Sequence, residues 1–124
     1  MARQRSDEGK VNADIALAFG HGPCRLLRNN VGMLRDRTGR PVAYGLGSMG
    51  KTVLRGPSDW IGWRTLTITP EMVGQRIAVF AAVEVKDKGK PTEEQLAFIN
   101  IVQDAGGLAG VARSVPDALS ILRM

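Results

Sequence analysis

The sequence has very few of the residues that build disulfides, soft-metal centres or nucleophilic triads. Among 124 residues there is one cysteine, Cys24, and one histidine, His21. One cysteine excludes an intramolecular disulfide and a Cys-cluster zinc site, and one histidine argues against a Ser-His-Asp centre or a histidine-rich metal site. We therefore expect Cys24 to be a small, partly buried residue and His21, between two glycines, to lie in a loop.

Long apolar runs are also missing. The longest, residues 77–83, is far shorter than the roughly 18–20 residues of a membrane span. The first ten residues lack the apolar core of a signal peptide. These absences predict a soluble cytoplasmic protein with no membrane partner, and the chain length fits a single domain over residues 1–124.

Positive charge is concentrated in the first half of the chain. Residues 1–65 carry 11 Lys/Arg against 5 Asp/Glu, whereas residues 66–124 carry 6 against 7. Such a basic surface suits a phosphate backbone, although a solvated basic face without a partner explains the charge alone equally well. Nucleic acid becomes the better interpretation only together with a site that acts on phosphate.

Such a site is suggested by residues 81–86, where an apolar run ends in an acid and a lysine. In a strand, alternate residues share a face, so the valines line one side while Glu84 and Lys86 end the other. We expect this strand to be buried, with the charged pair at its mouth. Charged groups there usually have a partner or a metal, although a strand that simply runs out into solvent explains an isolated pair.

A second acid, Asp59, follows the turn residues 56–58 and precedes a strand predicted from Trp60. If this strand pairs antiparallel with the strand of Glu84, the two carboxylates meet. Oxygen ligands of this kind suit Mg²⁺ or Mn²⁺, and the backbone carbonyl of Val85 could add another. A lysine beside the metal would orient the attacking water and offset charge on the phosphate.

These residues carry a resemblance to a known family. In order, Asp59, Glu84-x-Lys86 and Gln95 resemble the pattern of PD-(D/E)XK nucleases. The residues around them, 56–62 and 83–95, resemble the VRR-NUC (virus-type replication-repair nuclease) branch in its stand-alone, phage-type form. The resemblance runs over nearly the whole chain and implies an α/β fold with a mixed β-sheet flanked by helices.

The resemblance also implies an activity. It is that of an Mg²⁺- or Mn²⁺-dependent endonuclease that hydrolyses branched DNA, such as four-way (Holliday) junctions or flaps, during replication and repair. Asp59, Glu84 and the Val85 carbonyl would hold the metal, Lys86 would position the water and Gln95 would support the site. A protein this small offers little surface for recognising a branch, so we expect a homodimer. The resemblance also implies a viral origin within a bacterial host.

Several further residues have open interpretations. Glu8 lies where the superfamily often carries a metal-site glutamate, but Ser6 as N-cap would make it a first-turn acid favoured by the helix dipole. Gln95 also fits a capping box with Thr92. Arg113, at the end of its strand, is expected to face either DNA or solvent. The residues expected to contact DNA are Arg28, Asn29, Lys51, Arg55 and Lys88.

Residues 45–52 match the phosphate-binding P-loop, G-x-x-x-x-G-K-[ST]. That motif needs a helix immediately afterwards. Gly56 and Pro57 follow too soon for one, so we expect a glycine loop or a flap that brings Lys51 to the phosphates. A nucleotide-binding protein remains the distant alternative, and a non-catalytic nucleic-acid-binding module the nearer one.

The remaining elements are predicted from local signals. A first helix is expected to pack Val11, Ile15 and Phe19 on the sheet and to stop at residues 20–23. Two strands, 24–30 and 42–44, would be joined by the turn 36–40. Further predictions are a strand at 66–68, a helical turn at 70–74, a helix capped by Thr92, a strand at 108–112 and a helix capped by Ser114.

Overall fold

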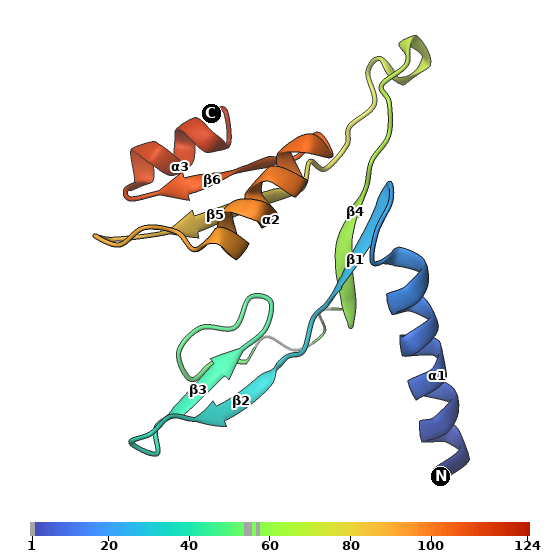
Figure 1. Cartoon of the computed structure of the whole chain (residues 1–124), viewed down its shortest axis with the longest axis vertical. Helices are drawn as coiled ribbons and strands as arrows, with labels where there is room; N and C mark the ends of the chain where they lie inside the picture. Colours follow the sequence, from blue (N-terminus) through green and yellow to red (C-terminus); the bar gives the residue numbers. More distant parts are fainter. Residues whose placement is uncertain (1, 54–55, 57) are drawn as a thin grey trace. The chain divides into compact units, whose positions relative to one another are not determined.

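The computed structural model describes residues 2–53, 56 and 58–124, and the chain divides into two compact units, Met1–Arg64 and Thr65–Met124. Each unit is described by itself. The elements in chain order are α1 (Ala2–Phe19), β1 (Cys24–Arg28), β2 (Gly32–Arg35), β3 (Pro41–Tyr44), β4 (Trp60–Arg64), the 3-10 turn η1 (Pro70–Met72), β5 (Ala81–Val85), α2 (Glu93–Asp104), β6 (Leu108–Ala112) and α3 (Val115–Ile121) (Figure 1).

Within the described residues, the strands form three two-stranded sheets. In the first unit β1 pairs antiparallel with β4, and β2 pairs antiparallel with β3. In the second unit β5 pairs parallel with β6. The predicted mixed α/β class is confirmed, but these small sheets stand in place of one continuous mixed sheet. The strand expected at residues 66–68 is wrong, because this segment has no strand partner and is irregular.

The predicted turn at residues 36–40 is confirmed, but the strand before it is not the predicted one. The turn joins β2 to β3, whereas the earlier strand, β1, ends at Arg28 and pairs with β4. The turn closes through two backbone hydrogen bonds, Asp36 N to Arg40 O and Gly39 N to Asp36 O. A short connection after Arg28 therefore separates two strands that the sequence pattern had merged.

The carboxylate of Asp36 organises this turn. Its Oδ1 accepts hydrogen bonds from the Thr38 hydroxyl at 2.7 Å, the Thr38 N–H at 2.8 Å and the Arg40 N–H at 3.0 Å. The Thr38 hydroxyl and then the Arg40 N–H lower the pKa of Asp36 below its ordinary value. Arg35 adds a bond from its guanidinium to the carbonyl of Gly39 at 2.8 Å.

A pH titration should detect this arrangement. A carboxyl with a lowered pKa stabilises the turn fully above its ordinary pKa of 3.8, and this stabilisation is lost as the pH falls through the lower folded value. We expect the NMR signals of the Thr38 and Arg40 amides to titrate together with the Asp36 carboxyl, below that ordinary pKa. Titration at or above the ordinary value would contradict the hydrogen-bonding of this turn.

Helix α1 begins earlier than predicted and presents a different face. It starts at Ala2, so Ser6 is not its N-cap and Glu8 lies inside the helix rather than in the first turn. Of the predicted face, Val11 and Phe19 are exposed, whereas Ile15 is half-buried as predicted. The half-buried positions include Asn12, whose Oδ1 accepts a bond from the Trp60 indole at 3.0 Å. A partly buried indole N–H needs an acceptor, and that need orients the helix here.

The second unit places one helix on each face of the β5–β6 pair. Glu84 of β5 lies in register with Val111 of β6, so the two share a face and Gly110 points to the other. Gln95 of α2 donates to Glu84, which puts α2 on the first face. A side chain at Gly110 would collide with Ile121 of α3, which puts α3 on the opposite face. Figure 1 shows both helices beside this sheet.

The covered side of β5 is the side that carries the acid. Ala82, Glu84 and Lys86 are half-buried, whereas Val83 is 37% and Val85 73% exposed. The predicted alternation is confirmed, but the predicted burial is wrong, because α2 covers the Glu84 face of β5 and α3 packs mainly on β6. Among the described residues, the buried apolar side chains are those of Ile99, Val102, Ala109 and Ala112.

Candidate active site

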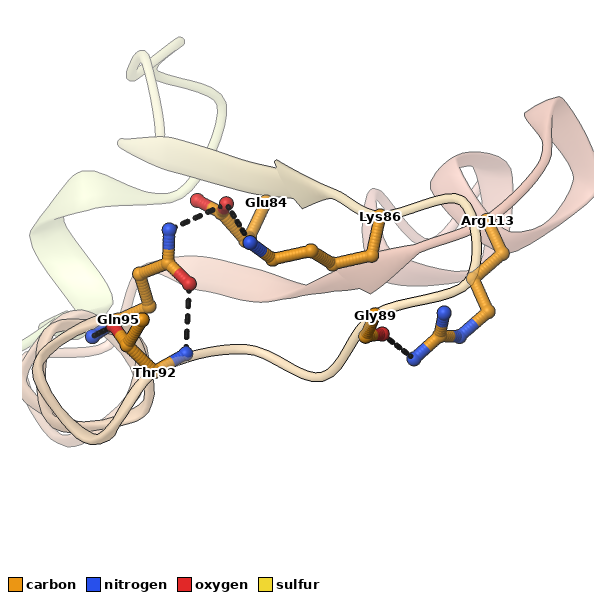
Figure 2. A network of polar contacts seen from close by, with 6 residues as sticks. All are labelled: Glu84, Lys86, Gly89, Thr92, Gln95 and Arg113. Carbon is orange, nitrogen blue, oxygen red and sulfur yellow. Dashed lines mark hydrogen bonds and ion pairs between the residues drawn. The ribbon is translucent and has the colours of Figure 1, made fainter.

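The candidate site is built where β5 ends. Glu84 is the penultimate residue of β5, and Lys86 is the first residue after this strand. They are two positions apart, so both side chains leave the same face. The Lys86 side chain runs back along the strand and places its Nζ 3.6 Å from Glu84 Oε1 (Figure 2). The side chain of Lys86 is 23% exposed and that of Glu84 is 31% exposed. The backbone N–H of Lys86 donates to the carbonyl of Ala112 at 3.1 Å. The pair is therefore half-sheltered and anchored through the backbone.

Gln95 joins this pair from the first turn of α2. Its Nε2 donates to Glu84 Oε1 at 2.8 Å, while its Oε1 accepts from the Thr92 N–H at 2.8 Å. The Thr92 hydroxyl in turn accepts from the Gln95 N–H at 3.1 Å, which completes a capping box. The capping-box interpretation of Gln95 is therefore confirmed, and because its oxygen caps the helix, its nitrogen is directed toward Glu84. Its support of a catalytic site stays a prediction.

The oxygen atoms left at this site fit a hard divalent cation. Glu84 Oε1 receives both Gln95 and Lys86, whereas Oε2 has no hydrogen-bond partner among the described residues. Residues 80 and 86 bond to β6 through their backbones, so Val85, which alternates with them, directs its carbonyl to the open edge of β5. A carboxylate oxygen and a backbone carbonyl are ligands that Mg²⁺ and Mn²⁺ accept.

Arg113 holds the loop that follows the site. Its guanidinium donates to the carbonyl of Asp87 at 3.1 Å and to that of Gly89 at 2.9 Å. Figure 2 shows the second of these bonds, from the end of β6 across to the loop. The predicted DNA contact Lys88 lies between the two carbonyls and is exposed. No local pattern predicts this role of Arg113, because the bonds go to backbone atoms 24 and 26 residues away.

In the first unit, Asp59 directly precedes β4, as predicted, and its backbone is held by Asn29. The Asn29 N–H donates to the Asp59 carbonyl at 2.7 Å, and its side-chain nitrogen donates to the Ser58 carbonyl at 3.0 Å. Its side-chain oxygen accepts from the Leu46 N–H at 3.1 Å. Asn29 thus fixes the segment that carries Asp59. The guanidinium carbon of Arg28 lies over the Trp60 ring, 5.6 Å from its centre. The DNA contacts predicted for Arg28 and Asn29 stay predictions.

The P-loop match does not have P-loop geometry. Met49 and Thr52 exchange both backbone hydrogen bonds, which puts Lys51 in a tight turn, where a P-loop would begin its helix. The Ser48 N–H donates to the Gly45 carbonyl, so this amide is already engaged within the loop. The described residues 52 and 53 are not helical. Lys51 is exposed and its predicted approach to phosphates stays a prediction.

The structure brings together three of the predicted site residues, Glu84, Lys86 and Gln95. Asp59 and the exposed Glu8 belong to the other unit, and Arg55 lies outside the described residues. No group of three or more His, Cys, Asp or Glu side chains with metal-binding geometry occurs among the described residues. The ligand set available to a metal in the second unit is therefore small and made of oxygen.

No helix within the described ranges is long and apolar enough to cross a membrane. No family model, curated protein or solved structure matches the chain.

Proposed function

We propose that this protein is a metal-dependent endodeoxyribonuclease of the PD-(D/E)XK kind, close to the VRR-NUC branch. The observation that carries the proposal is the contact of Lys86 and Gln95 with the same oxygen of Glu84, at 3.6 and 2.8 Å. An acid, a lysine and an oriented amide on one half-buried face match the ordered motif. A strand that merely runs out into solvent would have no reason to orient the carboxylate from a second element.

In the proposed reaction a water molecule is added across the P–O3′ bond, which leaves a 5′-phosphate and a 3′-hydroxyl. Lys86 orients the water and offsets negative charge on the phosphate. Gln95 keeps Glu84 in place, and Glu84 and the Val85 carbonyl are the proposed ligands of Mg²⁺ or Mn²⁺ in the second unit. The metal-binding role expected for Asp59, which belongs to the first unit, stays a prediction. When bound, that ion supplies Lewis-acid stabilisation of the phosphate charge.

Branched DNA is the proposed substrate, and a homodimer the proposed assembly. Two copies related by a two-fold axis would present two equivalent sites, which suits paired nicks across a four-way junction. The basic first half of the chain supports a polyanionic partner. A non-catalytic DNA-binding module is the competing proposal, since it explains the same charge without Glu84 and Lys86.

Cleavage of labelled linear, flap and four-way junction DNA with Mg²⁺, Mn²⁺ or EDTA tests the proposal. We expect cutting with either metal, none with EDTA, and preference for the junction. Glu84→Gln keeps the size and an acceptor for Gln95 but removes the charge, so the rate should fall about 10²–10⁴-fold. If no substrate is cut in either metal while DNA is still retained, the binding module is the better description.

A further inference from the structure

The β2–β3 hairpin carries a cluster of positive charge that the candidate site does not use. Arg35, Arg37 and Arg40 lie in and beside the turn that ends the hairpin, and all three are exposed. Figure 1 shows this turn between β2 and β3. We call these three residues the arginine tip. No ion pair joins any of them to a carboxylate within the described part of the chain. Three cations within six residues therefore face solvent with one acid, Asp36, among them.

That acid does not form a salt bridge with the arginines. Asp36 Oδ1 accepts three hydrogen bonds from inside the turn, two from Thr38 and one from the Arg40 backbone. The guanidinium of Arg35 donates one hydrogen bond to the Gly39 carbonyl, whereas the side chains of Arg37 and Arg40 have no hydrogen bond to any described residue. The turn is thus stiffened by the acid, and two arginines are left to meet an external anion.

The geometry points to the phosphate backbone of double-helical DNA as that anion, and we propose that the arginine tip binds it. A two-stranded ribbon is narrow enough to enter the major groove, where phosphates line both sides. Arginine presents a planar fork that matches phosphate oxygens, and a turn already held rigid loses little conformational entropy on binding. The inference rests on the proposed function, because it takes DNA as the substrate.

Binding measured without catalysis tests the arginine tip separately from the nuclease. The double variant R37Q/R40Q removes two cationic groups whose side chains make no hydrogen bond to any described residue, so the turn should survive. K10Q/R76Q is the matched control, because it lowers the net charge equally at two exposed positions elsewhere. Affinity for labelled duplex and junction DNA is measured in EDTA over a range of salt, and the Thr38 amide signal reports whether the turn is intact.

We expect R37Q/R40Q to bind roughly 10- to 100-fold more weakly at about 0.1 M salt, with a salt slope lower by about 2. K10Q/R76Q should stay close to the wild type. Equal affinities and slopes for the two variants would overturn the inference while leaving metal-dependent cleavage by the wild type untouched. DNA binding that depends on Arg37 and Arg40 with no cleavage in any metal would support the inference and remove the proposed nuclease. A wild-type protein that binds neither DNA would overturn the inference.

Discussion

Alanine at Lys86 is expected to abolish metal-dependent DNA cleavage and to leave the fold intact. The ammonium group is the only cation that contacts Glu84 among the described residues, at 3.6 Å. A group that positions the water and offsets phosphate charge typically contributes about 10²–10⁴-fold to the rate. The ion pair itself is partly exposed, so its loss should lower the free energy of unfolding by less than about 1 kcal/mol.

Lys90→Ala is the matched control for this variant. Lys90 is exposed in the loop that follows and has no predicted role, yet its removal changes the net charge by the same amount. Single-turnover cleavage of the junction and chemical denaturation are measured for both variants. If Lys86→Ala cuts DNA as fast as Lys90→Ala, Lys86 takes no part in the reaction and the proposed site is wrong.

Glutamate at Gln95 should separate the two roles of this side chain. A glutamate oxygen can still accept from the Thr92 N–H, so the capping box and the start of α2 are preserved. In the wild type, Gln95 Nε2 donates to Glu84 at 2.8 Å. In the variant a second carboxylate takes the place of this donor. We expect cleavage to fall about 10²-fold, whereas the helix keeps its stability to within about 1 kcal/mol.

Single-turnover cleavage and chemical denaturation check this separation. Full activity of Gln95→Glu at neutral pH would show that the amide nitrogen is not needed at Glu84.

Changes at Thr92 should affect the stability of α2 more than the rate of cleavage. Thr92→Ser keeps the hydroxyl that accepts from the Gln95 N–H and should be close to the wild type in both measurements. Thr92→Ala removes this cap and should cost about 1 kcal/mol of stability. Since the Thr92 N–H still holds the Gln95 oxygen, cleavage should fall less than in Gln95→Glu.

From Thr92 onwards the second unit could be predicted closely because its signals are local. Thr92 and Ser114 accept hydrogen bonds from backbone amides three residues on, and those bonds fix where α2 and α3 begin. Gly106, with φ of +97°, follows the end of α2. The predicted strand 108–112 coincides with β6. Each of these features depends only on residues a few positions apart.

The first unit was predicted less well because its elements depend on distant partners. α1 is oriented by a bond between Asn12 and Trp60, 48 residues apart, which no helical periodicity reveals. β1 ends at Arg28 because β4 is its partner, and the strand before the turn is a separate element, β2. The missed role of Asn29, which holds the Ser58 and Asp59 carbonyls, has the same origin.

The sequence by itself determined which residues could do chemistry: Asp59 before a strand, Glu84 and Lys86 two positions apart, and Gln95 three residues after Thr92. Strand alternation alone places Glu84 and Lys86 on one face. Only the tertiary structure decided which face α2 covers and which atom of Gln95 meets Glu84. That choice follows from a hydrogen bond: once the Gln95 oxygen is taken by the Thr92 N–H, only the nitrogen remains for the acid. Spacing in a sequence cannot assign the two ends of an amide, because the assignment depends on partners that only folding brings near.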